Sequence, residues 1–188
     1  MEDSMVVFRG FIAMDITPTP KILAFEEDIQ KTDADVKLVE PENIHITIKF
    51  LGDTDERHID AIEQCMKESV RGITPFPVTL KGTGVFPNTK YVKVLWVGIS
   101  DAGSIAPIAQ AIDTALVPLG FKKEQRGFSP HLTVGRVKSA RNKDRLLRVV
   151  QQYTTEEFMV QEINTLVLKK SELTPKGPIY STLREVRF

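Results

Sequence analysis

"PENIHITIKFLGD", residues 41–53, has the alternation of a half-buried β-strand and carries a histidine on its polar side. Apolar and polar positions alternate strictly: Ile44, Ile46, Ile48 and Phe50 against His45, Thr47 and Lys49. Because successive side chains of a strand point to opposite faces, we expect the apolar set to face a core. A histidine and a threonine two residues apart on the other face indicate a site.

The stretch "PHLTVGR", residues 130–136, repeats the same pattern on a second expected strand. His131 and Thr133 alternate there with apolar residues, so two of the three histidines fall in the order His, apolar, Thr, apolar. The two motifs lie 86 residues apart, which predicts a duplicated unit with halves at about 1–98 and 99–188. We expect the third histidine, His58 in "DERHID", to be a solvated helix residue.

Paired histidines suit acid–base chemistry on a phosphate ester. Their ordinary pKa near 6.5 allows one imidazole to be neutral and the other protonated near neutral pH. Each threonine can donate a hydroxyl hydrogen bond to a phosphate oxygen. The alternative is a histidine with only a structural role in its strand. That would readily explain one His-x-Thr motif, but it explains two matching motifs less well. A zinc site is the other alternative, but no cysteine is near either motif and neither strand adds a carboxylate, so we expect no metal or other cofactor.

The order of predicted elements indicates an α+β protein with antiparallel-rich sheets in a single domain. We expect strands at 5–16, 36–39, 44–51, 76–86, 91–99, 127–138, 158–170 and 179–187. We expect helices at 17–31, 53–72, 101–120 and 142–153. Trp96 lies in an apolar strand and is expected in the core.

Composition limits the class of partner. The 188 residues contain 25 Lys and Arg against 25 Asp and Glu, and this neutral balance argues against broad coating of nucleic acid. It favours contact with a short or terminal piece. The single cysteine excludes an internal disulfide. With no long apolar run and no signal-like start, we expect a cytoplasmic protein, without membrane contact, acting as a monomer.

Several stretches together resemble the two-histidine phosphoesterases, and among them the RNA 2′,3′-cyclic phosphodiesterase or 2′-5′ RNA ligase family. They cover nearly the whole chain: "RGFIAMDI", "ENIHITIKFLGD", "VFPNTKYVKVLWVGI", "FSPHLTVGR" and "SELTPKGPIYSTL". The resemblance implies a bilobal fold, with two pseudo-symmetric sheets flanked by helices around a central cleft. It also implies hydrolysis of RNA 2′,3′-cyclic phosphate ends, tRNA fragments among them, to 2′-phosphates. ATP-independent 2′-5′ ligation at the same site is the further implied activity.

The resemblance also implies roles for the motif residues. His131 would activate the nucleophile and His45 would protonate the leaving 3′ oxygen, while Thr47 and Thr133 would bind phosphate oxygens. Arg136 matches a family arginine for phosphate. Strict alternation places it on the opposite face from His131, and a bulge at Gly135 would re-aim it.

Further candidates surround the motifs. Lys49 shares the parity of His45 and would add positive charge, although an ordinary solvated lysine explains it as well. Tyr180, in "GPIY", matches a family motif and would line the cleft, with a core position the alternative. Arg126 and Phe128 precede the second motif and would meet the RNA backbone or a base.

Two other functions remain open on the sequence. A non-catalytic RNA- or nucleotide-binding module would keep the fold, but binding alone does not require two titrating histidines. A related phosphodiesterase acting on another phosphodiester would share the histidines and differ in substrate range.

Overall fold

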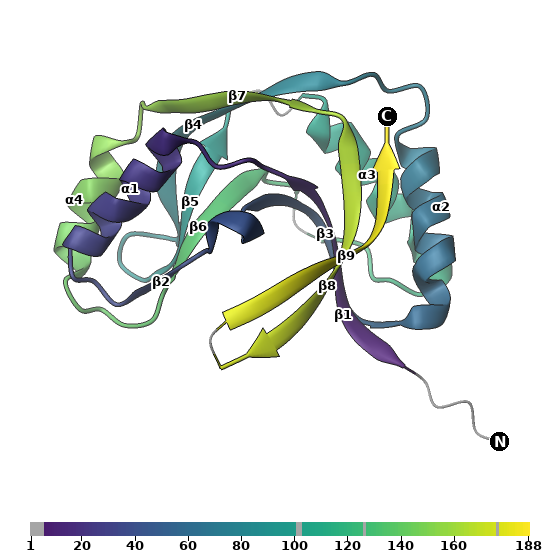
Figure 1. Ribbon diagram of the computed structural model, residues 1–188, viewed down its shortest axis with the longest axis horizontal. Helices are drawn as coiled ribbons and strands as arrows, with labels where there is room; N and C mark the ends of the chain where they lie inside the picture. Colours follow the sequence, from purple (N-terminus) through teal and green to yellow (C-terminus); the bar gives the residue numbers. More distant parts are fainter. Residues whose placement is uncertain (1–5, 101–102, 126, 176) are drawn as a thin grey trace.

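The computed structural model describes residues 6–100, 103–125, 127–175 and 177–188, and Figure 1 shows a curled sheet with helices at both ends. The strands are β1 (Val7–Asp15), β2 (Val36–Leu38), β3 (His45–Asp55), β4 (Phe76–Pro87), β5 (Val92–Ile99), β6 (His131–Val137), β7 (Glu157–Ile163), β8 (Thr165–Thr174) and β9 (Gly177–Arg187). The helices are α1 (Pro20–Lys31), α2 (Ile59–Ser69), α3 (Ile105–Ala115) and α4 (Lys143–Gln152), with 3₁₀ turns η1 (Pro41–Asn43), η2 (Glu56–His58) and η3 (Val117–Leu119). The predicted α+β class with an antiparallel sheet is confirmed.

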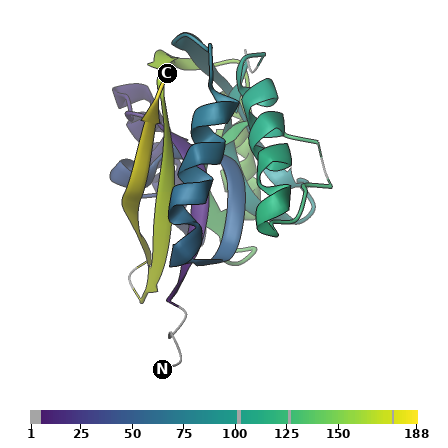
Figure 2. The ribbon, with the colours of Figure 1, turned by 90° about the vertical axis from the view of Figure 1, so that its right-hand side faces the viewer.

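The sheet is made of two four-stranded groups that meet at one point. Its order is β7-β4-β5-β6-β3-β1-β8-β9, with β2 added beside β6, and the pairings are antiparallel. We call β3, β1, β8 and β9 the first lobe and β6, β5, β4 and β7 the second. Helices α2 and α3 pack together beside the first lobe, as Figure 2 shows, and α1 packs with α4 beside the second. Each lobe takes strands from both halves of the chain, and the duplicated unit stays a prediction.

Apolar residues of both lobes fill one continuous core under the helices. In α2 the buried side chains are Ile62 and Met66, four positions apart and so on one face of the helix. The strands supply side chains with no exposed surface, among them Ile46 of β3 and Leu132 of β6. Those two residues hold the lobes together from the inside. No helix in the described ranges is long and apolar enough to cross a membrane.

Several element boundaries differ from the sequence prediction, and the predicted helix 53–72 is η2 followed by α2. Strand β3 does not stop at Gly52; it continues to Asp55, because Gly52 adopts a φ of 70° that accommodates a bulge. The predicted helix 101–120 is α3 followed by η3, and residues 101–102 lie outside the described ranges. The predicted strand 158–170 divides into β7 and β8.

Candidate functional site

The two His-x-Thr motifs face each other where the lobes join. The pairing recorded between β3 and β6 is Ile46 opposite Leu132. His45 and Thr47 flank Ile46 on β3, and His131 and Thr133 flank Leu132 on β6. Because Ile46 and Leu132 point into the core, the flanking side chains point to the other, concave face. That face therefore gathers His45, Thr47, His131 and Thr133.

Both histidines are held in the same way. Nδ1 of His45 lies 2.6 Å from the carbonyl oxygen of Asn43, and Nδ1 of His131 lies 2.8 Å from that of Ser129. A carbonyl oxygen only accepts, so each Nδ1 carries the proton and donates it. Nε2 is then the nitrogen available for proton transfer in each ring. In the neutral ring of His45, Nε2 accepts from the Thr47 hydroxyl at 3.0 Å.

His45 is packed among aromatic rings in the first lobe. Its ring centroid lies 4.9 Å from that of Phe11 and 5.5 Å from that of Tyr180, the latter edge-on. Burial lowers the pKa of His45 below its usual range; Lys169 adds to this, while the hydrogen bond to Asn43 opposes it. The imidazole of His45 is therefore predominantly neutral at neutral pH. Burial raises the pKa of Tyr180.

His131 has a matching aromatic neighbour in the second lobe. The Phe86 ring lies 5.0 Å away and edge-on, and the Trp96 ring lies 5.4 Å from that of Phe86. Trp96 stands opposite Thr133 in the sheet, so it belongs to the concave face. The prediction of a core tryptophan is wrong: Trp96 is half-buried and lies across Gly84, where a Cβ would come within 2.1 Å of the indole.

A bulge in β3 overturns the prediction for Lys49. Ile12 pairs with Lys49 and the next residue, Ala13, pairs with Thr47, so Ile48 is an extra residue in the strand. The parity changes there, and Lys49 turns into the protein with 8% of its surface exposed. Phe50, predicted to face the core, turns out to the concave face. Strict alternation fails because the extra residue inverts the parity of Lys49 and Phe50, and a second register shift, at Leu51, restores it.

The buried Lys49 has a structural partner. Its ammonium forms an ion pair with Asp113 of α3 and donates to the carbonyl oxygen of Lys122 at 2.7 Å. Burial would raise the pKa of Asp113, but hydrogen bonds from Lys49 and from the backbone N–H of Glu124 outweigh it and hold that pKa low. The pair therefore ties α3 and the segment after it to β3.

A bulge in β6 brings Arg136 to the site. Trp96 pairs with Thr133 and Leu95 pairs with Gly135, so Val134 is the extra residue. Arg136 is exposed between two buried neighbours, on the face of His131. Its charge lowers the pKa of both His45 and Tyr180, although it is a smaller cause than burial in each case. The extra residue is Val134, next to the Gly135 named in the sequence analysis, and Arg136 follows it on the face of His131.

Two further candidates and the third histidine complete the set of residues singled out in the sequence. Arg126 is outside the described residues. Phe128 is half-buried and packs against the core. His58 ends η2 half-buried, with its ring 6.1 Å from Phe121, so it is not simply solvated.

Two lysines of the concave face escaped the sequence analysis. Lys37 stands opposite Arg136 on β2. Lys169 of β8 is buried and forms an ion pair at 2.7 Å with Asp15, which stands opposite His45. Neither lies in a motif, and only strand pairing reveals them.

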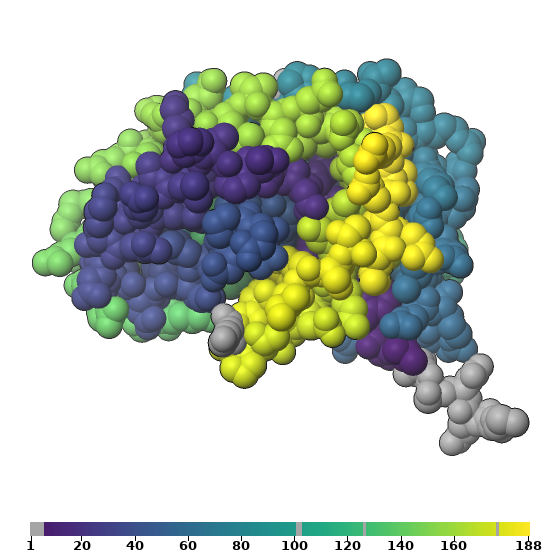
Figure 3. All heavy atoms as spheres, viewed as in Figure 1, coloured from purple at the N-terminus to yellow at the C-terminus, as the bar shows by residue number. Residues whose placement is uncertain are grey.

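The concave face is bordered by the β8–β9 hairpin. Figure 3 shows this hairpin (yellow) beside the segment that holds η1 (blue). The Asn43 side chain donates to the carbonyl oxygen of Pro178 at 3.5 Å, so the hairpin touches the residue that anchors His45. Among the described residues no group of three or more His, Cys, Asp or Glu side chains is arranged to hold a metal ion.

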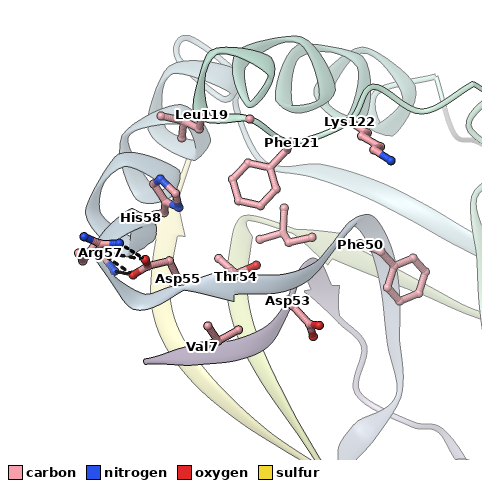
Figure 4. A pocket seen from close by; sticks show the side chains of 12 residues that line it. Val7, Phe50, Asp53, Thr54, Asp55, Arg57, His58, Leu119, Phe121 and Lys122 are labelled. Carbon is pink, nitrogen blue, oxygen red and sulfur yellow. Dashed lines mark hydrogen bonds and ion pairs between the residues drawn. The ribbon is translucent and has the colours of Figure 1, made fainter. Parts of the chain in front are cut away.

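A hollow of about 700 Å³ lies farther along β3, between that strand and the segment after η3. Figure 4 shows Phe121 and Lys122 above the strand and Phe50 at one end of the hollow. Asp53, His58 and the Asp55–Arg57 ion pair line the remainder. Neither His-x-Thr motif lines this hollow.

Comparisons with known proteins agree with this geometry. The model of the 2′-5′ RNA ligase superfamily matches residues 13–172. An RNA 2′,3′-cyclic phosphodiesterase of Methanocaldococcus jannaschii is 41% identical, over 94% of this chain and 99% of that one. One from Methanothermobacter thermautotrophicus is 38% identical, over 96% and 98%.

Solved structures show the same fold. TT0787 of Thermus thermophilus superposes with a TM-score of 0.77 at 25% identity, over 95% of this chain and 97% of that one. Escherichia coli LigT complexed with 3′-AMP gives 0.74 at 19% identity, over 97% and 98%. By sequence over nearly its whole length and by fold, the chain belongs to the 2′-5′ RNA ligase superfamily.

Proposed function

We propose that the protein hydrolyses RNA 2′,3′-cyclic phosphate ends to 2′-phosphates by acid–base catalysis between His45 and His131. The observation that carries the proposal is their equivalent setting across the Ile46–Leu132 pair, each with Nδ1 fixed by a carbonyl and Nε2 left to exchange protons. Family membership and the names of the relatives support the same activity.

In the proposed reaction, one neutral histidine takes a proton from water as the water oxygen attacks phosphorus. The P–O3′ bond breaks, and the other histidine, protonated, gives its proton to the departing 3′ oxygen. The hydroxyls of Thr47 and Thr133 donate to the non-bridging oxygens as negative charge grows on them. Arg136 adds a cation beside the same oxygens. No step is assigned to Lys49, because its ammonium is buried against Asp113.

The roles of the two histidines depend on their protonation states. The resemblance implies His131 as base and His45 as acid. The low pKa of His45 favours the reverse in the ligand-free protein, since a neutral imidazole is ready to accept a proton.

Ligation is the second candidate function, favoured by membership of the superfamily named for it. An RNA 5′-hydroxyl would replace water as nucleophile and form a 2′-5′ linkage. The strained cyclic ester would supply the driving force, so no ATP is needed. We further propose that the protein acts as a cytoplasmic monomer, with tRNA fragments among its substrates.

The test is incubation of a short RNA ending in a 2′,3′-cyclic phosphate with the protein in excess EDTA, followed by chromatography of the terminal product. We expect a 2′-phosphate. A 3′-phosphate would mean that the other P–O bond breaks and that the substrate is held the other way round. Binding without any product would replace the enzyme by the non-catalytic binding module. Activity on other phosphodiesters but not on this RNA would favour the related phosphodiesterase.

A further inference from the structure

A buried ion pair lies beside His45, and the reaction proposed above assigns it no step. Lys169 of β8 is 6% exposed, and its Nζ lies 2.7 Å from Oδ1 of Asp15. Asp15 in turn stands opposite His45 in the pairing of β1 with β3. Because a lysine is seldom buried without a charged partner, the pair fixes its ammonium in place. Two opposite charges are therefore held close to one imidazole of the site.

Apolar side chains surround the ammonium of Lys169. Lys169 stands opposite Phe11 on β1, and Phe11, Ala13 and Val167 form a buried cluster on the concave face. Alternate residues of a strand point the same way, so Asp15 lies on the same face of β1 as Phe11 and Ala13. The side chain of Lys169 extends past this cluster to reach Asp15. In such surroundings a charge acts on its neighbours more strongly than it would in water.

The two charges of the pair act on His45 in opposite directions. Burial is the largest cause of the lowered pKa of His45; the Lys169 ammonium also lowers it, and the Asp15 carboxylate raises it by a smaller amount. The ion pair as a whole therefore favours the uncharged imidazole. The other polar and charged side chains that face His45 are Thr47 on its own strand, His131 and Arg136 on β6, and Tyr180 on β9.

A glycine takes the place of Asp15 in the second lobe. Gly98 of β5 stands opposite His131, as Asp15 of β1 stands opposite His45. The position is closed to a side chain, since a Cβ on Gly98 would come 2.7 Å from the carbonyl oxygen of Lys81. The two histidines thus have matching hydrogen bonds at Nδ1 but different charged neighbours. The ion pair breaks the symmetry of the site.

We propose that Lys169 is a positioning residue whose ammonium, held by Asp15, keeps His45 uncharged in the ligand-free site, so that the two motif histidines enter the reaction in unequal states. The inference rests on the proposed function for its meaning in catalysis. The state of His45 itself is measured without any substrate.

The test follows the imidazole signals of the three histidines by NMR in the ligand-free protein, between about pH 4 and pH 9. The signal that is lost in His45→Ala identifies His45. We expect Lys169→Met to move the midpoint of the His45 titration to higher pH and Asp15→Asn to move it to lower pH. Both variants break the same ion pair, so a purely structural role would move the midpoint in the same direction in both.

Two further variants control for charge and for position. Lys169→Arg keeps the cation and should leave the His45 midpoint near that of wild type. Lys170→Met is the matched control, because the next residue of β8 points to the other face and forms an ion pair with Glu172 instead. An unchanged midpoint in Lys169→Met, or shifts of the same sign in Lys169→Met and Asp15→Asn, would overturn the proposal.

The pH profile of kcat/KM on the cyclic-phosphate RNA reports the same group, because it follows the ionisation of the free enzyme. In Lys169→Met one limb of the profile should move to higher pH: the acidic limb if His45 is the base, and the alkaline limb if it is the acid. A profile with both limbs unmoved would overturn the proposal. A shifted His45 titration in a protein that hydrolyses no cyclic-phosphate RNA would support the role of Lys169 and refute the proposed function.

Discussion

Strands β3 and β6 share one backbone design and differ in the side chains beyond it. Each begins with His-x-Thr and takes an extra residue at the third position after the histidine, Ile48 in one and Val134 in the other. The residue after the bulge faces inward and the next faces the cleft. In β3 these are Lys49 and Phe50; in β6 they are Gly135 and Arg136.

The inward residues show what each strand packs against. Lys49 reaches Asp113 on α3, whereas a Cβ on Gly135 would come 2.9 Å from Cγ1 of Val36 on β2. A side chain at this position of β6 would crowd the side chains of the short strand β2 that pairs beside it. The two strands therefore share the bulge. They differ in the two residues that follow it, one facing inward and one facing the cleft.

The largest loss of activity is expected from replacing the histidine that each of the two strands carries. His45→Ala and His131→Ala should each lower kcat by about 10² to 10⁴, because each removes one partner in proton transfer. Steady-state kinetics on the cyclic-phosphate RNA would measure this. His58→Ala, a histidine outside the concave face, is the control and should stay near wild type. Near wild-type turnover in His131→Ala would contradict the shared role.

Removing the inward cation of β3 should cost stability more than activity. Lys49→Met leaves Asp113 buried without its ion pair, and we expect the free energy of unfolding to fall by about 3–5 kcal/mol. Denaturant titration followed by circular dichroism would measure it. The double variant Lys49→Met with Asp113→Leu should recover most of the loss. A change below about 1 kcal/mol in the single variant would show that the pair is not structural.

Removing the outward cation of β6 should act on the substrate. Arg136→Ala is expected to lower kcat/KM about 10- to 100-fold, since a hydrogen bond to a charged group is lost. Arg136→Lys should restore part of it, as a point charge without the forked geometry. Arg71→Ala, in the turn after α2, is the control for loss of a surface arginine. An unchanged kcat/KM in Arg136→Ala would place the arginine outside the site.

Two buried carboxyl groups, Asp113 and Glu26, have pKa values shifted in opposite directions. Asp113 has a lowered pKa, so its contribution is present above about pH 4 and is lost as the pH falls through that pKa. Glu26 of α1 is 7% exposed, and its Oε1 finds no hydrogen-bond partner among the described residues. Burial, with the charge of Glu40, raises its pKa from 4.5 to about 7. The folded state therefore loses stability as the pH rises from 4.5 to about 7.

Glu26→Gln should remove that loss. The variant should exceed wild type in free energy of unfolding by about 2–3 kcal/mol at pH 8, with the difference fading toward pH 4. Denaturant titrations at both pH values would measure it. An equal difference at the two values would show that ionisation of Glu26 is not the cause.

The sequence predicts the fold class, the elements and the four motif residues because these depend on periodicity and on a repeated pattern. It fails at Lys49 and Phe50, since a single extra residue inverts the parity of a strand and leaves no local signature there. At Arg136 the glycine before it was such a signature. Phe11, Phe86 and Lys169 reach the site through pairing between distant strands, which one strand's sequence does not encode.

The central claim is that one strand supplies the general acid and the other the general base. The most direct test replaces the leaving 3′ oxygen with sulfur, which departs without being protonated. His45→Ala and His131→Ala would be assayed on the oxygen and the 3′-sulfur cyclic substrates in EDTA. The account predicts that the sulfur substrate rescues one variant only, the one that has lost the acid, and the low pKa of His45 favours His131→Ala as that variant. Rescue of both variants, or of neither, would contradict acid–base catalysis shared between β3 and β6.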